Sequence, residues 1–289
     1  GLRVRDVAMS PDARYLSMIG VQDGRASVLI VDRTRGSAAQ PLLRAQDDDK
    51  YTPSWCAWAN ATRLLCGFRA IESERGKFYA ITRLLAINAD GSNLIQITNR
   101  RSATGGQFED TVLDWTPDDP ETVLLEVDEG SEISMLGGAT DVVGGYADGY
   151  PTVYAVDVNN GKRKVAQRER PPIAHFVTDG RGKARLGYGY KKDEIIFLGR
   201  LEGQDSWREL SRIKAYQVDD DFSLIAAIAG TNFAYATGHH QGRRAVFKVD
   251  LTDAADPVVV FSHPEVDVEH PLFTREGLLI GVRYQTERP

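Results

Sequence analysis

The chain has 289 residues, of which 42% are hydrophobic and 26% are charged, and its formal net charge is −6. This composition is typical of a folded globular protein, and the acidic balance argues against a nucleic-acid-binding protein, which usually carries a basic excess. No apolar run approaches the ~18–20 residues that span a bilayer. The 27 glycines against 3 methionines fit a turn-rich β protein better than a helical one.

The first structural unit in the chain is a pair of strands joined by residues 10–16, with the sequence Ser-Pro-Asp-Ala-Arg-Tyr-Leu. Proline suits the first corner of a turn because its φ angle is already fixed there. An aspartate side chain accepts a hydrogen bond from the backbone two residues further on. We therefore expect an apolar strand that ends at Met9, a tight turn at Pro11 and Asp12, and a second strand that opens at Tyr15.

Variations on this strand–turn–strand unit recur along the chain. The turn centres lie near residues 12, 60, 118, 180, 231 and 275, so their spacing is roughly 44–62 residues, which is the period of a four-stranded propeller blade. A second hairpin follows in each of the first five periods, and Asp-Gly and Asn-Gly turns between apolar strands mark two of these hairpins. Four short strands per period predict an all-β fold, a β-propeller of four-stranded antiparallel blades. A two-sheet sandwich is the main alternative.

The repeats predict a single propeller domain over residues 1–289. Six blade starts are visible, and the sixth period contains only one hairpin before residue 289, so the last blade is incomplete. An open ring leaves unpaired edge groups. We therefore expect the ring either to stay open or to be closed by residues beyond the chain, with the natural protein continuing past Pro289. The predicted blades are residues 1–50, 51–105, 106–170, 171–215, 216–264 and, in part, 265–289.

Three stretches resemble the propeller of the prolyl oligopeptidase family of serine peptidases, which includes dipeptidyl and acylaminoacyl peptidases. They are Val-Tyr-Ala-Val-Asp-Val-Asn-Asn-Gly at residues 153–161, Thr-Asp-Gly-Arg-Gly-Lys-Ala-Arg at residues 178–185, and the last eleven residues of the chain. The resemblance covers nearly the whole chain, although periplasmic translocation-type propellers share the turn at residues 10–12. It implies a propeller that precedes an α/β-hydrolase domain with a Ser-Asp-His triad.

The chain departs from that family because the hydrolase domain is missing from it. No Gly-x-Ser-x-Gly elbow, which would expose a nucleophile, occurs in the sequence. We therefore expect no catalytic residue and no peptide hydrolysis by residues 1–289 alone. The resemblance implies an accessory role in which the propeller gates the access of peptide substrates and docks the hydrolase domain. We expect no cofactor, no nucleic-acid partner and no membrane span.

Candidate substrate-binding residues are expected in the enlarged connections between second and third strands, because loops on a rigid scaffold often carry binding residues. The enlarged connections are residues 69–78 and the Gly-rich residues 128–150. Glu72 and Glu74 resemble the acidic pair with which dipeptidyl members hold a free amine, although solvated loop charge is the favoured interpretation. The candidates for this rim are Arg69, Glu72, Glu74, Arg75, Tyr146, His239 and His240.

Metal sites are not expected. The adjacent histidines His239 and His240 lack a visible third ligand, and a tetrahedral site needs three or four. The aspartate runs at residues 47–49 and 219–221 lack the alternating oxygen ligands of a calcium loop. Three tryptophans on first strands are expected in the core rather than along a channel, because aromatic side chains bury large areas. These tryptophans are Trp55, Trp58 and Trp115.

The two cysteines, Cys56 and Cys66, fall opposite each other on neighbouring strands if residues 60–62 form the turn. Opposed Cβ atoms in an antiparallel pair lie ~4.5–5.5 Å apart, so a bridge needs little adjustment. Two alternatives stay open, a disulfide or two free buried thiols. A disulfide favours an exported protein, so we expect a periplasmic or secreted location, with the cytoplasm as the alternative.

Two other functions remain as alternatives. One is a stand-alone propeller of the periplasmic translocation type, which binds a protein partner. The other is a propeller enzyme with a site on its axis, such as a lactonase or a glycosidase. An axial site needs converging carboxylates or a metal, and the first strands offer few acids, namely Asp6, Asp114, Asp267 and Glu269.

Overall fold

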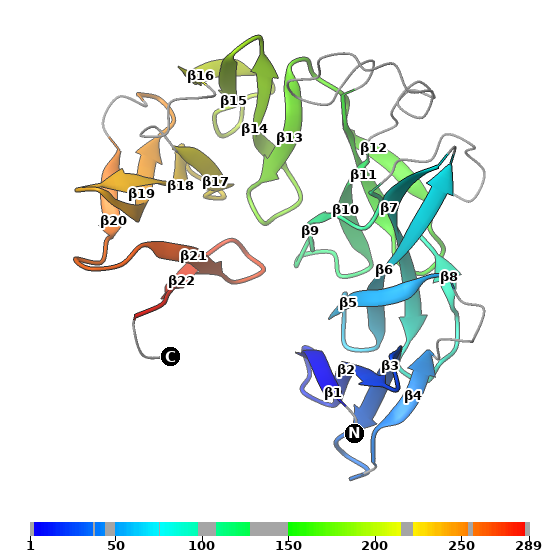
Figure 1. The fold of residues 1–289 in the computed structure, drawn as a ribbon. Coiled ribbons are helices and arrows are strands. Elements are labelled where there is room, and N and C mark those ends of the chain that lie inside the picture. Colours follow the sequence, from blue (N-terminus) through cyan, green and yellow to red (C-terminus); the bar gives the residue numbers. More distant parts are fainter. Residues whose placement is uncertain are drawn as a thin grey trace. The chain divides into compact units, whose positions relative to one another are not determined.

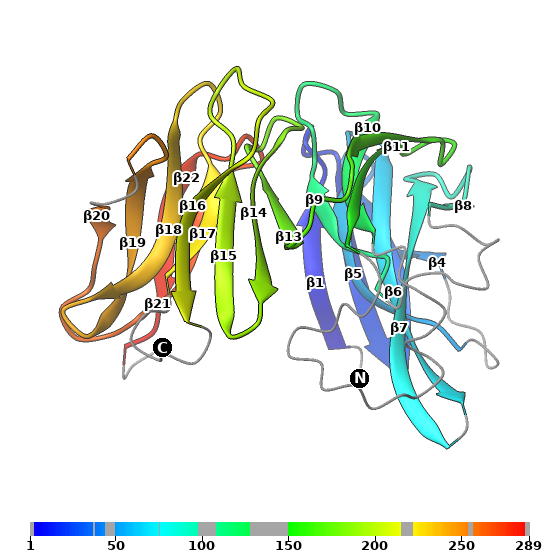
Figure 2. The same ribbon diagram turned by 90° about the horizontal axis from the view of Figure 1, so that it is seen from above.

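The structure is a computed structural model that describes residues 3–36, 38–43, 50–74, 76–97, 108–127, 150–214, 222–253 and 257–286. Every regular element in these ranges is a β-strand (Figures 1 and 2). Among the described residues there is no helix with the length and apolar character required to cross a membrane. The described residues thus agree with the all-β fold that the repeats predict.

The first three sheets each contain four strands. The first sheet has the order β1-β2-β3-β4, the second β5-β6-β7-β8, and the third β12-β11-β10-β9. Each strand therefore pairs with its neighbours in the chain. The strands are β1 (Arg3–Met9), β2 (Tyr15–Gln22), β3 (Arg25–Asp32), β4 (Gln40–Leu43), β5 (Thr52–Trp58), β6 (Arg63–Glu74), β7 (Lys77–Asn88), β8 (Ile95–Gln96), β9 (Val112–Asp114), β10 (Thr122–Val127), β11 (Thr152–Asp157) and β12 (Arg163–Gln167).

The fourth and fifth sheets repeat this pattern, with the orders β13-β14-β15-β16 and β17-β18-β19-β20, and the sixth sheet pairs β21 with β22. The strands are β13 (Ile173–Thr178), β14 (Ala184–Lys191), β15 (Glu194–Gly199), β16 (Arg208–Lys214), β17 (Ser223–Ala227), β18 (Phe233–His240), β19 (Arg243–Asp250), β20 (Val258–Phe261), β21 (Val268–Phe273) and β22 (Leu279–Tyr284). A four-stranded antiparallel sheet of consecutive strands is the blade of a β-propeller. The predicted fold class is confirmed.

Each of the six sheets lies inside one of the predicted blade ranges. The chain divides into two compact units, which are described separately below. The first unit comprises Gly1–Val112, Asp119–Asp128 and Tyr154–Lys164, and the second comprises Leu113–Asp118, Glu129–Val153 and Val165–Pro289. Whether residues 1–289 act as a single domain stays a prediction.

The turn between β1 and β2 has the hydrogen bonds that its sequence predicts. The carboxylate of Asp12 accepts hydrogen bonds from the Ser10 hydroxyl at 2.6 Å and from the backbone N–H of Arg14 at 3.1 Å. The Ser10 hydroxyl oxygen in turn accepts a bond from the Tyr15 N–H at 2.9 Å. These contacts, led by the Ser10 bond, hold the pKa of Asp12 below its ordinary value. The side chains of the turn thus satisfy backbone groups that its tight geometry leaves unpaired.

Each unit has a core between two adjacent sheets. In the first unit, side chains of β2 and β3 pack against those of β5 and β6, with Trp58 only 1% exposed. In the second unit, Leu186 and Phe197 of the fourth sheet pack against alanines and valines of the fifth. Burial of these apolar faces contributes about 25 cal/mol per Å² and is the main term that holds one sheet on the next.

Buried arginines tie the second strands of two sheets to their neighbours. Arg63, at the start of β6, is 1% exposed. Its Nε donates to the Val158 carbonyl at 2.9 Å, and its Nη1 donates to the Asn88 side chain at 3.0 Å and to the Asn93 carbonyl at 2.7 Å. Arg185, the second residue of β14, donates to the Arg200 and Thr231 carbonyls and to Glu202. In both places a guanidinium joins two successive blades.

Candidate functional site

The first group of predicted rim residues lies on a hairpin rather than in a loop. β6 and β7 pair continuously from Arg63 with Asn88 to Glu74 with Lys77, so the expectation of an enlarged loop over residues 69–78 is wrong. Arg69 is exposed on this hairpin. Glu72 forms an ion pair with Lys50, which accounts for its charge without a bound amine. The long twelve-residue strands thus replace the connection that the sequence suggested.

The predicted histidines also lie on a strand. His239 and His240 end β18 and pair with Arg244 and Arg243 of β19, instead of lying in a connecting loop. His240 packs edge-on against Phe247 with ring centroids 6.5 Å apart. The described part of the chain contains no group of three or more His, Cys, Asp or Glu side chains that could hold a metal ion.

Several candidates fall outside the described residues. These are Arg75, Tyr146, the Gly-rich connection within residues 128–149, and the aspartate runs at residues 47–49 and 219–221. For Glu74 the structure describes the backbone alone, at the end of β6. The roles predicted for these residues stay predictions.

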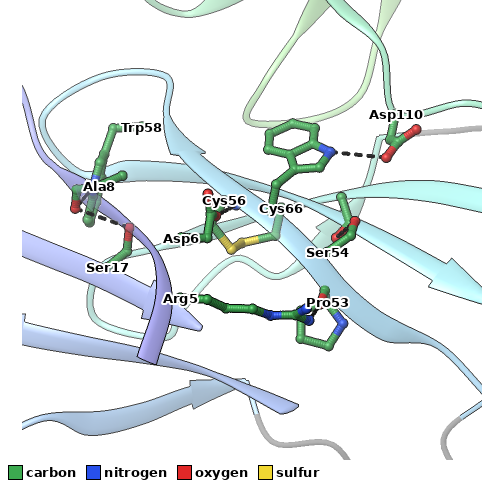
Figure 3. Close-up of a disulfide and its surroundings, with 12 residues drawn as sticks. Arg5, Asp6, Ala8, Ser17, Pro53, Ser54, Cys56, Trp58, Cys66 and Asp110 are labelled. Atoms are coloured by element: carbon green, nitrogen blue, oxygen red, sulfur yellow. Dashed lines mark hydrogen bonds between the residues drawn. A yellow bond between two sulfur atoms is a disulfide. The ribbon is translucent and has the colours of Figure 1, made fainter. Parts of the chain in front are cut away.

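Cys56 and Cys66 form a disulfide between β5 and β6 (Figure 3). They are directly opposed in the strand register, with Cα atoms 4.1 Å apart. The backbone N–H of Cys56 also donates to the carboxylate of Asp6 on β1 at 2.5 Å. The Trp58 indole N–H donates to the Ala8 carbonyl on the same strand at 3.2 Å. The bridge therefore lies at the junction of the first two sheets, and Cys56 and Cys66 are both buried.

The described structure also contains a pocket that the sequence did not indicate. It has a volume of about 450 Å³ and is lined by the first strands of four successive sheets, β9, β13, β17 and β21, and by the residues that follow them. All its lining residues belong to the second unit. The side chains that define its surface are Trp115, Phe176, Ile225, Ala226, Phe273 and Arg275. Of the three tryptophans predicted in the core, Trp58 is buried, whereas Trp115 lines this pocket.

Two charged residues line the pocket, Asp114 and Arg275. Asp114 is 3% exposed, and its carboxylate accepts hydrogen bonds from the backbone N–H groups of Thr116 at 2.8 Å and Gly182 at 2.9 Å. Arg275 lies over the indole of Trp115, with its guanidinium carbon 4.5 Å from the ring centroid. Arg275 is exposed overall, but the loss of solvation around its guanidinium lowers its pKa.

Turns that follow the lining strands meet beside the pocket. A Cβ atom added to Gly180 would lie 2.7 Å from the backbone nitrogen of Gly277, so the turns after β13 and β21 are in backbone contact. Arg181 forms two hydrogen bonds with the carboxylate of Asp118, at 2.6 and 2.7 Å. These contacts fix the turns that carry Trp115 and Arg275.

Comparison with solved structures finds the same fold in parts of several peptidases. No family model matches the chain, and no curated protein matches its sequence. The chain superposes on a structure from an analysis of two prolyl endopeptidases and their inter-domain dynamics, with a TM-score of 0.55 and 14% identity over 94% of its length. An acylaminoacyl peptidase with a bound chloromethyl ketone matches over 93%, with a TM-score of 0.52 and 10% identity. Prolyl oligopeptidase B from Galerina marginata matches over 94%, with a TM-score of 0.51 and 10% identity.

The present chain spans only 38–40% of the length of these three peptidase chains. At 10–14% identity the likeness is one of fold. Residues 1–289 therefore form a β-propeller similar to part of larger peptidase chains.

Proposed function

We propose that residues 1–289 are the non-catalytic propeller of a serine peptidase of the prolyl oligopeptidase type. In this role the propeller limits which peptides reach the catalytic serine, and it binds the α/β-hydrolase domain that carries that serine. We further propose a periplasmic or secreted location for the protein.

The observation that carries the proposal is the extent of the structural likeness. Three peptidase structures match more than nine tenths of the present chain, while the chain covers about two fifths of each of them. A shared fold alone does not specify an activity. The resemblance of residues 153–161 and 178–185 to propellers of this family gives independent support from the sequence.

An accessory role is supported by the residues themselves. The chain lacks the Gly-x-Ser-x-Gly elbow that presents the nucleophile of an α/β-hydrolase. The Cys56–Cys66 disulfide fits an oxidising compartment, where disulfides persist. Alkylation of thiols in intact cells, followed by mass spectrometry of the unreduced protein, tests the location. We expect no alkylated cysteine, whereas two alkylated cysteines would place the protein in a reducing compartment.

The activity is tested by labelling the complete product of the gene with a fluorophosphonate probe, which reacts with activated serines. We expect one labelled serine outside residues 1–289 and hydrolysis of blocked peptide p-nitroanilides. Residues 1–289 alone should be neither labelled nor active. A complete product that takes up no label and cleaves no peptide, while it co-purifies stoichiometrically with another protein, would favour the stand-alone interaction propeller.

A further inference from the structure

The pocket of the second unit has the dimensions of a small-molecule site. It is lined by the first strands of four sheets and by two turns in backbone contact. Its volume of about 450 Å³ lies within the range of such sites, ~300–1,000 Å³. The chemistry of its lining side chains then decides which ligand it accepts.

The two charged side chains of the lining are both engaged within the protein. The carboxylate of Asp114 is 3% exposed and accepts hydrogen bonds from the backbone N–H groups of Thr116 and Gly182. Arg275 stacks on Trp115 and has a further interaction with the rest of the chain. A charged ligand would therefore bury its charge beside side chains that already have partners, which is unfavourable.

The two hydroxyl groups of the lining are engaged as well. The hydroxyl of Thr178 donates to the Leu113 carbonyl at 3.4 Å. The hydroxyl oxygen of Thr274 accepts a hydrogen bond from the backbone N–H of Leu278 at 3.3 Å. What remains for a ligand is mainly apolar surface, which favours an uncharged molecule.

The aromatic walls of the pocket are held in place by other rings. Phe176 packs edge-on against Trp207 with ring centroids 5.8 Å apart, and the ring of Phe273 lies 5.7 Å from that of Tyr235. Trp115 and Phe273 are half-buried, so part of each ring stays accessible to a ligand. Aromatic rings favour offset or edge-to-face packing with another ring. Because the walls are already fixed, a ligand ring loses little affinity to the ordering of side chains.

We propose that this pocket binds an uncharged molecule with an aromatic ring, and that the ring packs against Trp115 and Phe273. The inference does not depend on the proposed peptidase function, because it uses the residues of the pocket alone. A free aromatic molecule and an aromatic side chain of a peptide present the same ring, so the experiment includes one probe of each kind.

The test is isothermal titration calorimetry of residues 1–289 with N-acetyl-L-phenylalanine amide, which is uncharged. We expect one site per chain and an affinity about tenfold or more above that of N-acetyl-L-alanine amide, because burial of the ring removes apolar surface from water. The acid N-acetyl-L-phenylalanine should bind about tenfold more weakly than the amide, since its charge would be buried without a partner. Toluene is the free ring. Tighter binding of the amide than of toluene would identify a peptide side chain as the ligand, and the reverse order would identify a free aromatic molecule.

A pair of phenylalanine variants locates the site. Phe273→Ala removes one wall and should weaken the binding of both ring probes about tenfold. The matched control is Phe261→Ala, which removes a half-buried phenylalanine whose ring lies 6.1 Å from that of Tyr284 and which does not line the pocket. It should change the affinities less than about twofold, as expected of a substitution outside the site. Cooperative unfolding in urea is checked first for both variants.

Tryptophan emission gives a second readout that keeps a ring in the pocket. Trp115→Phe should abolish the change in emission that the phenylalanine amide causes. Trp55→Phe should retain that change, because the Trp55 indole donates to Asp110 in the first unit. Failure of both ring probes to bind, equal affinities for the phenylalanine amide and its acid, equal effects of the two phenylalanine variants, or an emission change that persists in Trp115→Phe would each overturn the proposal.

Discussion

Replacement of Arg63 by methionine is expected to destabilise the first unit by about 3 kcal/mol. The side chain is 1% exposed and donates three hydrogen bonds, to Val158, Asn88 and Asn93. At the low end of ~1.5 kcal/mol for each bond from a charged donor, three bonds contribute about 4–5 kcal/mol, and their loss also leaves acceptors unpaired. Burial also carries a desolvation cost, which lowers the pKa of the Arg63 guanidinium. Removal of the guanidinium removes this cost and offsets about 1–2 kcal/mol of the lost stability.

Equilibrium unfolding in urea, followed by tryptophan fluorescence, measures this change. Arg63→Lys keeps the charge but loses the forked guanidinium. Its free energy of unfolding should therefore lie between those of the wild type and the methionine variant. Arg35→Met is the control, because that side chain is 76% exposed and its ion pair with Asp32 is 3.5 Å long. It should cost less than about 0.5 kcal/mol. If Arg63→Met unfolds at the urea concentration of the control, the inference that this arginine joins two blades is wrong.

Three further predictions concern stability. The Cys56–Cys66 disulfide closes a loop with a sequence separation of 10. Its reduction should lower the free energy of unfolding by about 2–3 kcal/mol. An unchanged urea midpoint in the presence of reductant would contradict this prediction. Gly180→Ala should lower the free energy of unfolding, measured by thermal unfolding, by about 2 kcal/mol more than Gly230→Ala does. Both glycines have φ +70°, but only at Gly180 does the added Cβ lie within 3 Å of other backbone atoms. Hydrogen bonds from Thr34 and Arg14 lower the pKa of Asp32 to about 2 from 3.8. Because the folded value is the lower one, its stabilisation is complete above about pH 4 and is lost as the pH falls towards 2, so Asp32→Asn should flatten the fall of the urea midpoint over that range.

The repeat of the fold could be predicted because its signals are local. The turn at Ser10 to Tyr15 is specified by side chains that bond to their own backbone neighbours. Asn60 and Asp179 accept backbone hydrogen bonds from residues two positions further on in the corresponding turns of the second and fourth sheets. Alternation of apolar residues within short segments then indicates the strands. The opposed positions of Cys56 and Cys66 follow from one such hairpin, so the register that permits the disulfide was accessible from the sequence.

The extended β6–β7 hairpin could not be predicted in the same way. Its outer half contains Arg69, Glu72 and Glu74, and charged residues of this kind are typical of a solvated loop. The pairing of the two strands depends instead on backbone hydrogen bonds, which the side chains do not indicate. The sequence around His239 and His240 predicts a loop for the same reason, although both residues lie on β18. The polar end of a strand has no sequence pattern that separates it from a connection.

The pocket was not predicted because its residues come from four distant segments. Trp115 and Arg275 are 160 positions apart in the sequence, and their contact depends on the packing of successive sheets. The burial of Arg63 could not be predicted either, because an arginine at the start of a strand is usually exposed to solvent. In both cases the contacts of the side chain are made with a neighbouring blade, which a local sequence pattern does not show.

The proposed role of this propeller, to limit the access of peptides to a catalytic serine, can be measured as the dependence of cleavage on substrate length. The complete product of the gene is incubated with blocked peptides of increasing length and with unfolded casein, and kcat/KM is measured for each. We expect rapid cleavage of short peptides and a steep fall to no detectable cleavage of casein. Cleavage of casein at the rate of the short peptides would contradict it.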